Sequence, residues 1–233
     1  TAWSILGLVP KPAGRIVGGD IIYQGESLLG KSPAEMREIR GSGICMVMQD
    51  PLTSLNPVFN IGNQIIESLK MDGNLSLRLL RQKAIDLMTN VRIPAPETRL
   101  AGFPHQMSGG MRQRVVGAIA ISRSPNILIA DEPTTSLDVA VAGQVMAELS
   151  ALCSELGSAL LLISHDLAMA ARWCERMAML DGGRKVEDGP SHQLLTRPQS
   201  PVGQRLVASA QAREGGRSPA RPDNGSVLRV EEM

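Results

Sequence analysis

The chain has 233 residues, 43% of them hydrophobic, which is ordinary for a globular protein with one large domain or two small ones. Its formal net charge of +1 argues against a strongly basic surface, so no nucleic-acid partner is expected. Three scattered cysteines without metal-ligand spacing exclude a disulfide framework and favour a reducing compartment.

The first part of the chain combines short strands with helices. Residues 44–48 form a continuous apolar run that is typical of a buried strand, and residues 19–24 predict another short strand. Between residues 50 and 106, apolar side chains recur at helical spacing and prolines bound the segment, which predicts a mostly helical insert. Helices are expected at 1–8, 32–40, 61–71 and 76–91.

From residue 107 onwards, strands and helices alternate. This alternation is typical of a mainly parallel sheet whose strands are joined by crossover helices, so we expect an α/β fold. The strands expected in this sheet are 44–48, 127–130, 159–163 and 177–180. Helices are expected after Gly110 and at 140–152 and 167–176, with a terminal helical piece at 194–195 and 202–208. Every apolar run is shorter than the about 20 residues that span a bilayer, so any membrane role is expected to come through a partner.

The first chemical motif is an acidic pair at the end of a strand. Residues 126–133 read NILIADEP, so an apolar strand ends in Asp131 and Glu132. The carboxyl ends of parallel strands are where α/β proteins bind ligands, and Mg²⁺ on a triphosphate needs only one or two protein carboxylates. One carboxylate can therefore serve Mg²⁺ while the next faces an attacking water. The alternative is an ordinary acidic pair before a proline turn.

The second motif is a serine with two glycines at the start of a predicted helix. Residues 107–114 read MSGGMRQR. Free backbone N–H groups at a helix start bind anions, glycine lets phosphate oxygens approach the backbone, and a serine hydroxyl can donate to them. Ser108, Gly109 and Gly110 are therefore expected to contact phosphate; the alternative is a helix start without a ligand. Together the two motifs indicate nucleoside triphosphate chemistry, although the printed sequence contains no G-x-x-x-x-G-K-[ST] phosphate loop.

Two single residues also follow predicted strands. Gln49 leaves the strand at 44–48 for a turn-rich segment, where its amide can bind Mg²⁺ or water and swing with the loop. His165 follows the strand at 159–163, and it lies at the same sheet edge as Asp131 if the two strands are parallel neighbours. From there it can reach a γ-phosphate. The alternatives are a plain loop glutamine and a structural histidine.

In this order and at this spacing, the motifs resemble those of ATP-binding-cassette (ABC) ATPases. MSGGMRQR resembles their signature motif, ILIADEP their Walker B strand, and residues 136–138 their D-loop. The resemblance implies that Asp131 and Gln49 bind Mg²⁺, that Glu132 is the catalytic base, and that His165 steadies the γ-phosphate. The residues it implies for nucleotide binding are Gln49, Ser108, Gly109, Gly110, Gln113 and Asp138.

Longer segments resemble the group of peptide, nickel and glutathione importers. The matching segments are QDPLTSLNPVF at 49–59, FPHQMSGGMRQR at 103–114, ADEPTTSLDV at 130–139 and RPQSPVGQRL at 197–206. The chain departs from the group at 200–203, where it reads SPVG instead of the usual His-Pro-Tyr-Thr.

The resemblance also implies a domain organisation. It predicts a P-loop NTPase-like parallel sheet core with a helical subdomain at about 50–106, within a nucleotide-binding domain at 1–208. The phosphate loop of this family precedes the first helix, so that loop and the N-terminal strands are expected to be absent from the chain. Residues 209–226 are expected to form a linker, and 227–233 to begin a second element that resembles the first strand of a second cassette. The sequence therefore predicts a piece of a longer protein or a truncated gene model.

Several functional expectations follow from the resemblance. With ATP and Mg²⁺, the chain is expected to energise an importer of peptides or related small solutes at the cytoplasmic face of the inner membrane. The expected partners are inner-membrane permease subunits, a second ATPase domain in a homo- or hetero-pair and, indirectly, a periplasmic solute-binding protein. Without a phosphate loop, the chain as printed is expected to be inactive alone. Two alternatives stay open: an ABC-type ATPase without a transport role, and a non-catalytic fragment that only supplies a signature motif to a partner cassette.

Overall fold

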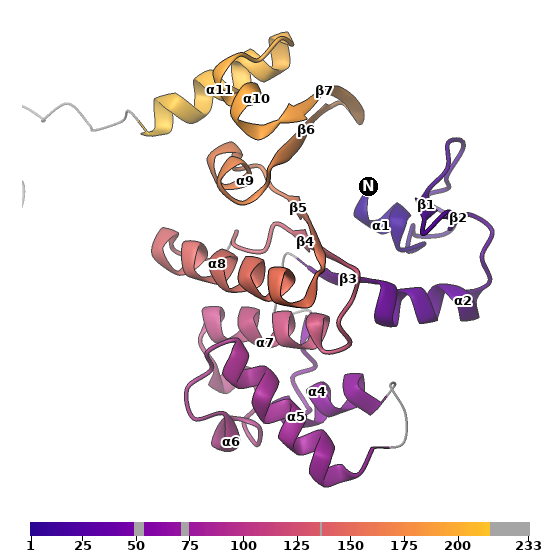
Figure 1. Cartoon of the computed structure of the whole chain (residues 1–233), viewed down its shortest axis with the longest axis vertical. Helices are drawn as coiled ribbons and strands as arrows, with labels where there is room; N and C mark the ends of the chain where they lie inside the picture. The colour runs from indigo at the N-terminus through magenta and orange to yellow at the C-terminus, as the bar shows by residue number, and fades with distance from the viewer. Residues whose placement is uncertain (49–53, 71–74, 136, 215–233) are drawn as a thin grey trace, which may run out of the picture. The chain divides into compact units, whose positions relative to one another are not determined.

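The computed structural model describes residues 1–48, 54–70, 75–135 and 137–214 (Figure 1). Contacts within the chain divide it into two compact units, Thr1–His165 and Asp166–Met233. None of the helices described is long and apolar enough to cross a membrane.

A three-stranded parallel sheet forms the frame of the first unit. Its strands are β3 (Ile44–Val47), β4 (Ile127–Asp131) and β5 (Ala159–Ile163), with β4 in the middle. Along both pairings the register is regular, so that Ala130 lies opposite Val47 on one side and Leu162 on the other. Three of the four predicted strands, and the parallel arrangement of these three, are therefore confirmed.

The side chains of these strands alternate between two hydrophobic cores, as the pleat of a strand requires. One core receives Cys45, Val47, Leu128 and Leu160. The other receives Ile44, Met46, Ile129 and Ile163.

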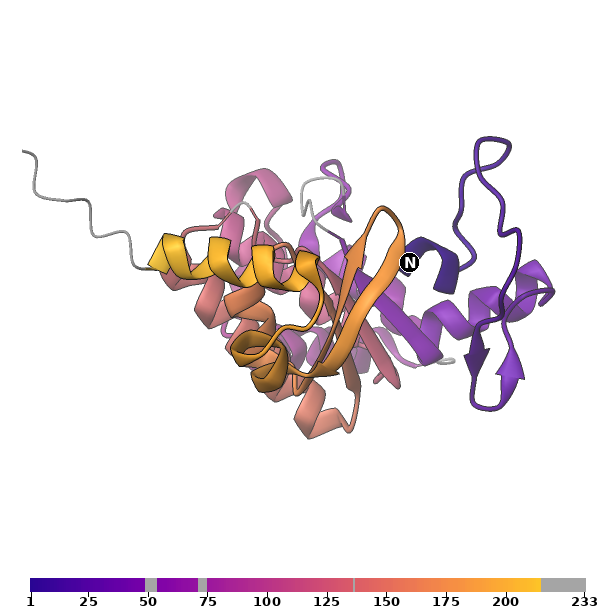
Figure 2. The ribbon, with the colours of Figure 1, turned by 90° about the horizontal axis from the view of Figure 1, so that it is seen from above.

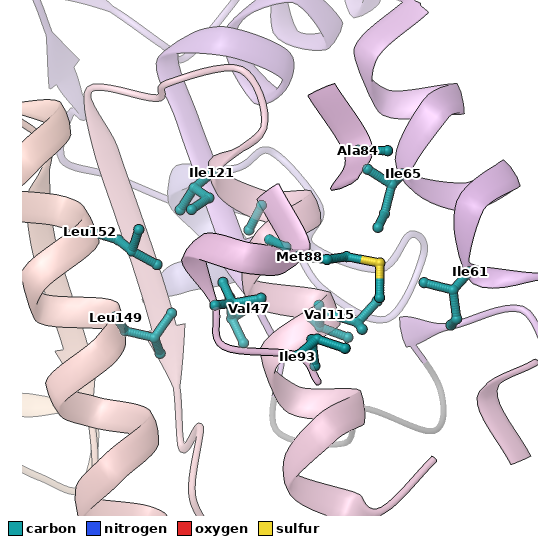
Figure 3. Packing of buried hydrophobic residues seen from close by; sticks show 14 of the residues in the cluster. Val47, Ile61, Ile65, Ala84, Met88, Ile93, Val115, Ile121, Leu149 and Leu152 are labelled. Atoms are coloured by element: carbon teal, nitrogen blue, oxygen red, sulfur yellow. The ribbon is translucent and has the colours of Figure 1, made fainter. Parts of the chain in front are cut away.

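The first core lies between the sheet and two long helices, α7 (Gly109–Ile121) and α8 (Val139–Leu156). Figure 3 shows Leu149 and Leu152 of α8 close to Val47 of β3 and Ile121 of α7. Burying an aliphatic side chain of this size contributes about 1.5–3 kcal/mol. The predicted helices after Gly110 and at 140–152 are confirmed, the second with an extra turn at its C-terminal end.

The predicted helical insert packs on the outer side of α7. It consists of α4 (Ile61–Lys70), α5 (Leu77–Asn90), α6 (Pro96–Arg99) and the 3₁₀ turn η2 (Pro104–Gln106). Helix α4 buries positions 61, 65 and 69 and α5 buries 80, 84 and 88, four residues apart, so each helix turns one apolar stripe inward. In Figure 3, Ile65, Ala84 and Met88 lie on the same side of α7. Both predicted helices are confirmed.

The N-terminal part of the first unit supplies the second core. Helix α1 (Ala2–Ile5) and helix α2 (Pro33–Glu38) contribute to it, and the π-helical turn η1 (Ile39–Gly43) leads from α2 into β3. Between the two helices, β1 (Ile22–Tyr23) and β2 (Glu26–Ser27) form an antiparallel hairpin. Its turn residues Gln24 and Gly25 both have positive φ, as tight hairpin turns require. The predicted helix at 1–8 is thus shorter, and the predicted strand at 19–24 has a partner that the sequence analysis did not predict.

The second unit corrects the prediction for residues 177–180. They belong to β6 (Arg176–Asp181), which pairs with β7 (Arg184–Pro190) in a separate antiparallel sheet and not with the parallel one (Figure 2). The reason is the turn of Gly182 and Gly183, whose φ values of +52° and +76° return the chain at once. A parallel strand would need a crossover connection of a dozen or more residues.

Helices complete the second unit. Helix α9 (Leu167–Trp173) precedes the hairpin, and α10 (Ser191–Thr196) and α11 (Pro201–Glu214) follow it. Because α11 continues to Glu214, residues 209–214 are helical and not part of a linker as predicted. The rest of the predicted linker and the predicted strand near the C-terminus lie outside the described residues.

Candidate functional site

The carboxyl edge of the parallel sheet brings three of the predicted residues together. Strand β4 ends at Asp131 and β5 at Ile163, and these two residues are paired. Glu132 N then donates a hydrogen bond to Ile163 O at 2.9 Å, so the pairing continues one residue beyond the strand. His165 Nδ1 lies 3.1 Å from Glu132 Oε1. The predicted position of His165 at the same sheet edge as Asp131 is confirmed.

The Glu132 carboxylate is held at both oxygens. His165 contacts Oε1, and the Thr135 hydroxyl donates to Oε2 at 2.8 Å. The Thr135 hydroxyl, and after it His165, hold the pKa of the Glu132 carboxyl below its usual range. The Glu132 side chain is 26% exposed and that of His165 63% exposed, so an ionised acceptor and an imidazole face solvent together. Glu132 itself has a φ of +46°, a left-handed conformation that is uncommon for residues other than glycine.

Asp131 offers a suitable oxygen ligand for a divalent cation. It is half-buried at the end of the central strand. In the part of the chain that the structure describes, no three His, Cys, Asp or Glu side chains converge on a metal position. Mg²⁺ needs no such set, because one or two carboxylates with phosphate oxygens and waters complete its octahedron. The residues present therefore fit Mg²⁺ bound together with a nucleotide.

A second group of predicted residues lies where α7 and α8 begin. Ser108 caps α7, its Oγ accepting a hydrogen bond from Met111 N at 3.2 Å. Asp138 caps α8 in the same way, through Val141 N at 3.0 Å. A Cβ atom on Gly110 would lie 3.0 Å from Val141 Cγ1, so the two helix starts are in close contact. Each start presents backbone N–H groups and the positive end of a helix dipole, which favours anions.

Gln113 differs from the other predicted site residues because it is buried inside the protein. The residue is only 2% exposed, and its Nε2 has no hydrogen-bond partner among the described residues. This burial does not support the predicted contact with a nucleotide. Gln49 and Ser136 lie outside the described residues.

An ion cluster around the buried Glu148 carboxylate was not predicted. Arg114 Nε lies 2.9 Å from Glu148 Oε2 of α8, and Arg92 Nε lies 3.9 Å from Glu148 Oε1. Arg114 also donates to the Arg92 carbonyl at 3.3 Å. The cluster thus joins α7, α8 and the turn after α5. The available signal was a glutamate on the apolar face of a predicted helix.

Thr135 was also missed as a contact of Glu132. It lies three residues after Glu132, the distance at which a threonine hydroxyl reaches back across a turn to the preceding residues. The spacing of three residues could have indicated the contact between Thr135 and Glu132.

Comparison with known proteins gives a consistent picture. The family model described as "ABC transporter" matches residues 3–135, more than half of the chain. Among curated relatives, the probable peptide ABC transporter ATP-binding protein y4tR of Sinorhizobium fredii is 43% identical over 98% of this chain and 68% of its own length. The dipeptide transport ATP-binding protein DppD of Escherichia coli is 43% identical over 88% of this chain and 62% of its length. The oligopeptide transport ATP-binding protein OppD of Bacillus subtilis is 40% identical over 90% of this chain, which spans 58% of OppD.

Solved structures support the same fold. The dimeric ATP-binding cassette MJ0796 in a post-hydrolysis state with ADP and Pi superimposes with a TM-score of 0.67 at 25% identity, over 75% of this chain and 74% of that one. The structure of cbiO1 from Clostridium perfringens has a TM-score of 0.72 at 22% identity, over 91% of this chain and 81% of its own, and supports the fold alone. The α/β, P-loop NTPase-like fold is therefore confirmed. The chain contains an ATP-binding domain and belongs to the ABC transporter family.

Proposed function

We propose that this chain is the ATP-hydrolysing part of an ABC importer for peptides or related small solutes. The observation that carries the proposal is the contact of His165 with Glu132 beside Asp131, at the carboxyl edge of the sheet. The names of the relatives, which describe peptide, dipeptide and oligopeptide import, support the substrate class. Because the chain spans 58–68% of these relatives, the activity proposed is that of the whole protein.

The residues at the sheet edge have separate roles in this proposal. Glu132 accepts a proton from the attacking water: its half-buried carboxylate is ionised, as a proton acceptor must be, although its lowered pKa makes it a weaker base. His165 steadies the γ-phosphate from the neighbouring strand end. Asp131 and Gln49 hold Mg²⁺, which when bound neutralises charge on the phosphates.

The start of α7 serves a second nucleotide. Ser108, Gly109 and Gly110 present N–H groups and a hydroxyl to the phosphates of ATP bound on a partner cassette, and Asp138 lies beside them at the start of α8. Gln113 supports this segment from inside the protein. The partner is a second ABC ATPase domain, identical or different.

The helical insert is the proposed contact with the inner-membrane permease, so the chain lies peripherally at the cytoplasmic membrane face. A periplasmic solute-binding protein takes part only indirectly. The exposed charges of α4 and α5, among them Glu67, Arg78 and Asp86, allow this contact to be tested. Reversing them should abolish stimulation of ATP hydrolysis by the permease and spare the basal rate. Equal loss of both rates would argue against the contact.

Uptake in cells tests the transport role directly. Deleting the gene should abolish growth on a dipeptide as the sole source of an essential amino acid, and the unmodified gene should restore growth while a Glu132→Gln copy should not. Co-purification with a permease should accompany restored growth. ATP hydrolysis without permease binding or uptake would indicate an ABC-type ATPase without a transport role. Uptake that is restored equally by the Glu132→Gln copy would indicate a part that only supplies its signature motif.

A further inference from the structure

We propose that Thr135 is a positioning residue for Glu132, fixing the orientation of the carboxylate that accepts the proton from water. The inference rests on the proposed function and adds to it a residue that none of the sequence motifs assigns to the reaction. It follows from the hydrogen bonds around the Glu132 side chain.

The Thr135 hydroxyl lies between two acceptors of the same residue. It is 2.8 Å from Glu132 Oε2 and 3.3 Å from the Glu132 carbonyl oxygen, so its single proton is directed mainly to the carboxylate. The Thr135 backbone N–H donates to the same carbonyl at 3.3 Å, which holds the hydroxyl in place within a short turn. The turn from Glu132 to Thr135 therefore determines where the Thr135 hydroxyl lies.

Two contacts from different elements fix the plane of the carboxylate. His165, after β5, contacts Oε1, while Thr135, after β4, contacts Oε2. One contact alone would leave the terminal torsion of a glutamate free, because rotation about that bond is broad and soft. Each carboxylate oxygen has two acceptor positions, so one hydrogen bond to an oxygen does not use up its capacity to accept from water.

The two contacts differ in how firmly the protein holds the donor. The His165 side chain is 63% exposed on a segment that follows β5, and the proposed reaction directs it towards a phosphate. Thr135 is bonded to the backbone of Glu132 itself and has no such second task. During hydrolysis Thr135 is thus the partner that keeps the carboxylate oriented.

Removing the hydroxyl should therefore reduce turnover and leave substrate binding intact. Moving a catalytic group by about 1 Å can lower the reaction rate strongly. The hydrogen bond from Thr135 is made to a charged carboxylate, and such bonds are stronger than those between neutral groups. For Thr135→Val, which keeps the size and shape of the side chain, we expect kcat to fall about tenfold with KM unchanged. Thr135→Ser, which keeps the hydroxyl, should retain most of the activity.

The experiment compares these variants in the full-length gene product. Steady-state ATP hydrolysis gives kcat and KM, and thermal unfolding reports the integrity of the fold. Thr89→Val is the matched control, because Thr89 is exposed like Thr135 and its hydroxyl also makes a local hydrogen bond, to Ile85 O at 2.9 Å, but on helix α5. Thr135→Ala removes the same hydroxyl without adding a methyl group, should the valine variant fold poorly.

A double variant separates positioning from a structural role. In single-turnover hydrolysis, Thr135→Val should slow the unmodified protein but add little to the loss already caused by Glu132→Gln, since both act through one carboxylate. Equal effects in the two backgrounds, or a Thr135→Ser variant as slow as Thr135→Val, would overturn the proposal. Unchanged kcat in Thr135→Val and Thr135→Ala, with normal turnover in the unmodified protein, would overturn it while the proposed function stands. No ATP hydrolysis by the unmodified full-length protein would overturn both.

Discussion

Glu132 and Glu148 are both glutamates of the first unit, yet the structure holds their carboxylates by different means. Glu132 lies at the sheet edge, 26% exposed, with a threonine hydroxyl and an imidazole as partners. Glu148 is 6% exposed between α7 and α8, with two guanidinium groups beside it. The Glu132 carboxylate is open to water at the sheet edge, whereas the Glu148 carboxylate is buried beside Arg114 and links α8 to α7. The difference separates a carboxylate that we propose to react from one that joins helices.

The largest expected effect comes from removing the charge of the exposed carboxylate. Glu132→Gln should lower ATP turnover by about 10²–10⁴-fold, because an amide cannot take a proton from water. The unfolding free energy should change little in comparison. Steady-state hydrolysis and urea unfolding of the full-length protein measure the two effects. If Glu132→Gln lost stability and activity in parallel, the proposed difference between Glu132 and Glu148 would be wrong.

The reverse pattern is expected at the buried carboxylate. Glu148→Gln should lower the unfolding free energy by about 3–5 kcal/mol, because Arg114 is left buried without its counter-charge. Turnover per folded molecule should fall much less. Glu155→Gln is the matched control, since Glu155 is exposed on the same helix α8. Similar unfolding curves for the two variants would contradict the structural role of Glu148.

The two glycines at the start of α7 sharpen the comparison between ligand contact and packing. A Cβ atom at Gly109 would meet Leu137 Cδ2 at 3.8 Å, an ordinary contact, so Gly109→Ala should change the unfolding free energy by no more than about 1 kcal/mol. If phosphate approaches this backbone, ATP hydrolysis by the paired cassettes should nevertheless drop several-fold. Gly143→Ala on α8, where a Cβ would meet nothing within 4 Å, is the control. Equal hydrolysis by Gly109→Ala and Gly143→Ala would argue against a phosphate at Gly109.

The smallest expected effect concerns Glu187, a carboxylate of the second unit that accepts hydrogen bonds from the segment before α11. The backbone N–H of Gln199, the Ser200 hydroxyl and the Ser200 N–H lower the pKa of Glu187 from its ordinary value of 4.5. Because the folded-state pKa is the lower one, the charge stabilises the fold above pH 4.5, and this contribution is lost as the pH falls through the folded pKa.

The test compares melting temperatures across the pH range. Glu187→Gln should melt slightly below the unmodified protein at pH 7, and the gap should close in acid as the carboxyl of the unmodified protein is protonated. Glu175→Gln, at an exposed position of the same unit, serves as the control. A gap that persists unchanged at low pH would mean that Glu187 acts through its shape and not its charge.

The sequence was sufficient for the parallel sheet and for part of the site. Apolar strands separated by helices leave few arrangements, and residues that follow neighbouring parallel strands must meet at one edge, as Glu132 and His165 do. The strand β7 was not predicted because RKVEDGP has no apolar alternation, and its pairing with β6 depends on the turn at Gly182. A regular α/β alternation therefore misassigned a hairpin strand to the parallel sheet.

The burial of polar side chains was not predictable from the sequence. The resemblance to ABC ATPases implied a nucleotide contact for Gln113, which stays a prediction, but nothing in the sequence indicated that this glutamine is buried. The partners of Glu148 come from α7 and from the turn after α5, more than thirty residues earlier. Sequence spacing alone gives no signal for contacts of that range.

Side chains of β3 and β4 point alternately into two cores, and this limits where insertions and deletions can be tolerated. Inserting or deleting one residue in β4 would exchange the side chains destined for the two cores and would also shift Glu132 away from the sheet edge where His165 meets it. The register of β4 thus determines both the packing of the two cores and the position of Glu132. Length variation between homologous genes should therefore be confined to connections such as the β6–β7 turn and excluded from β4.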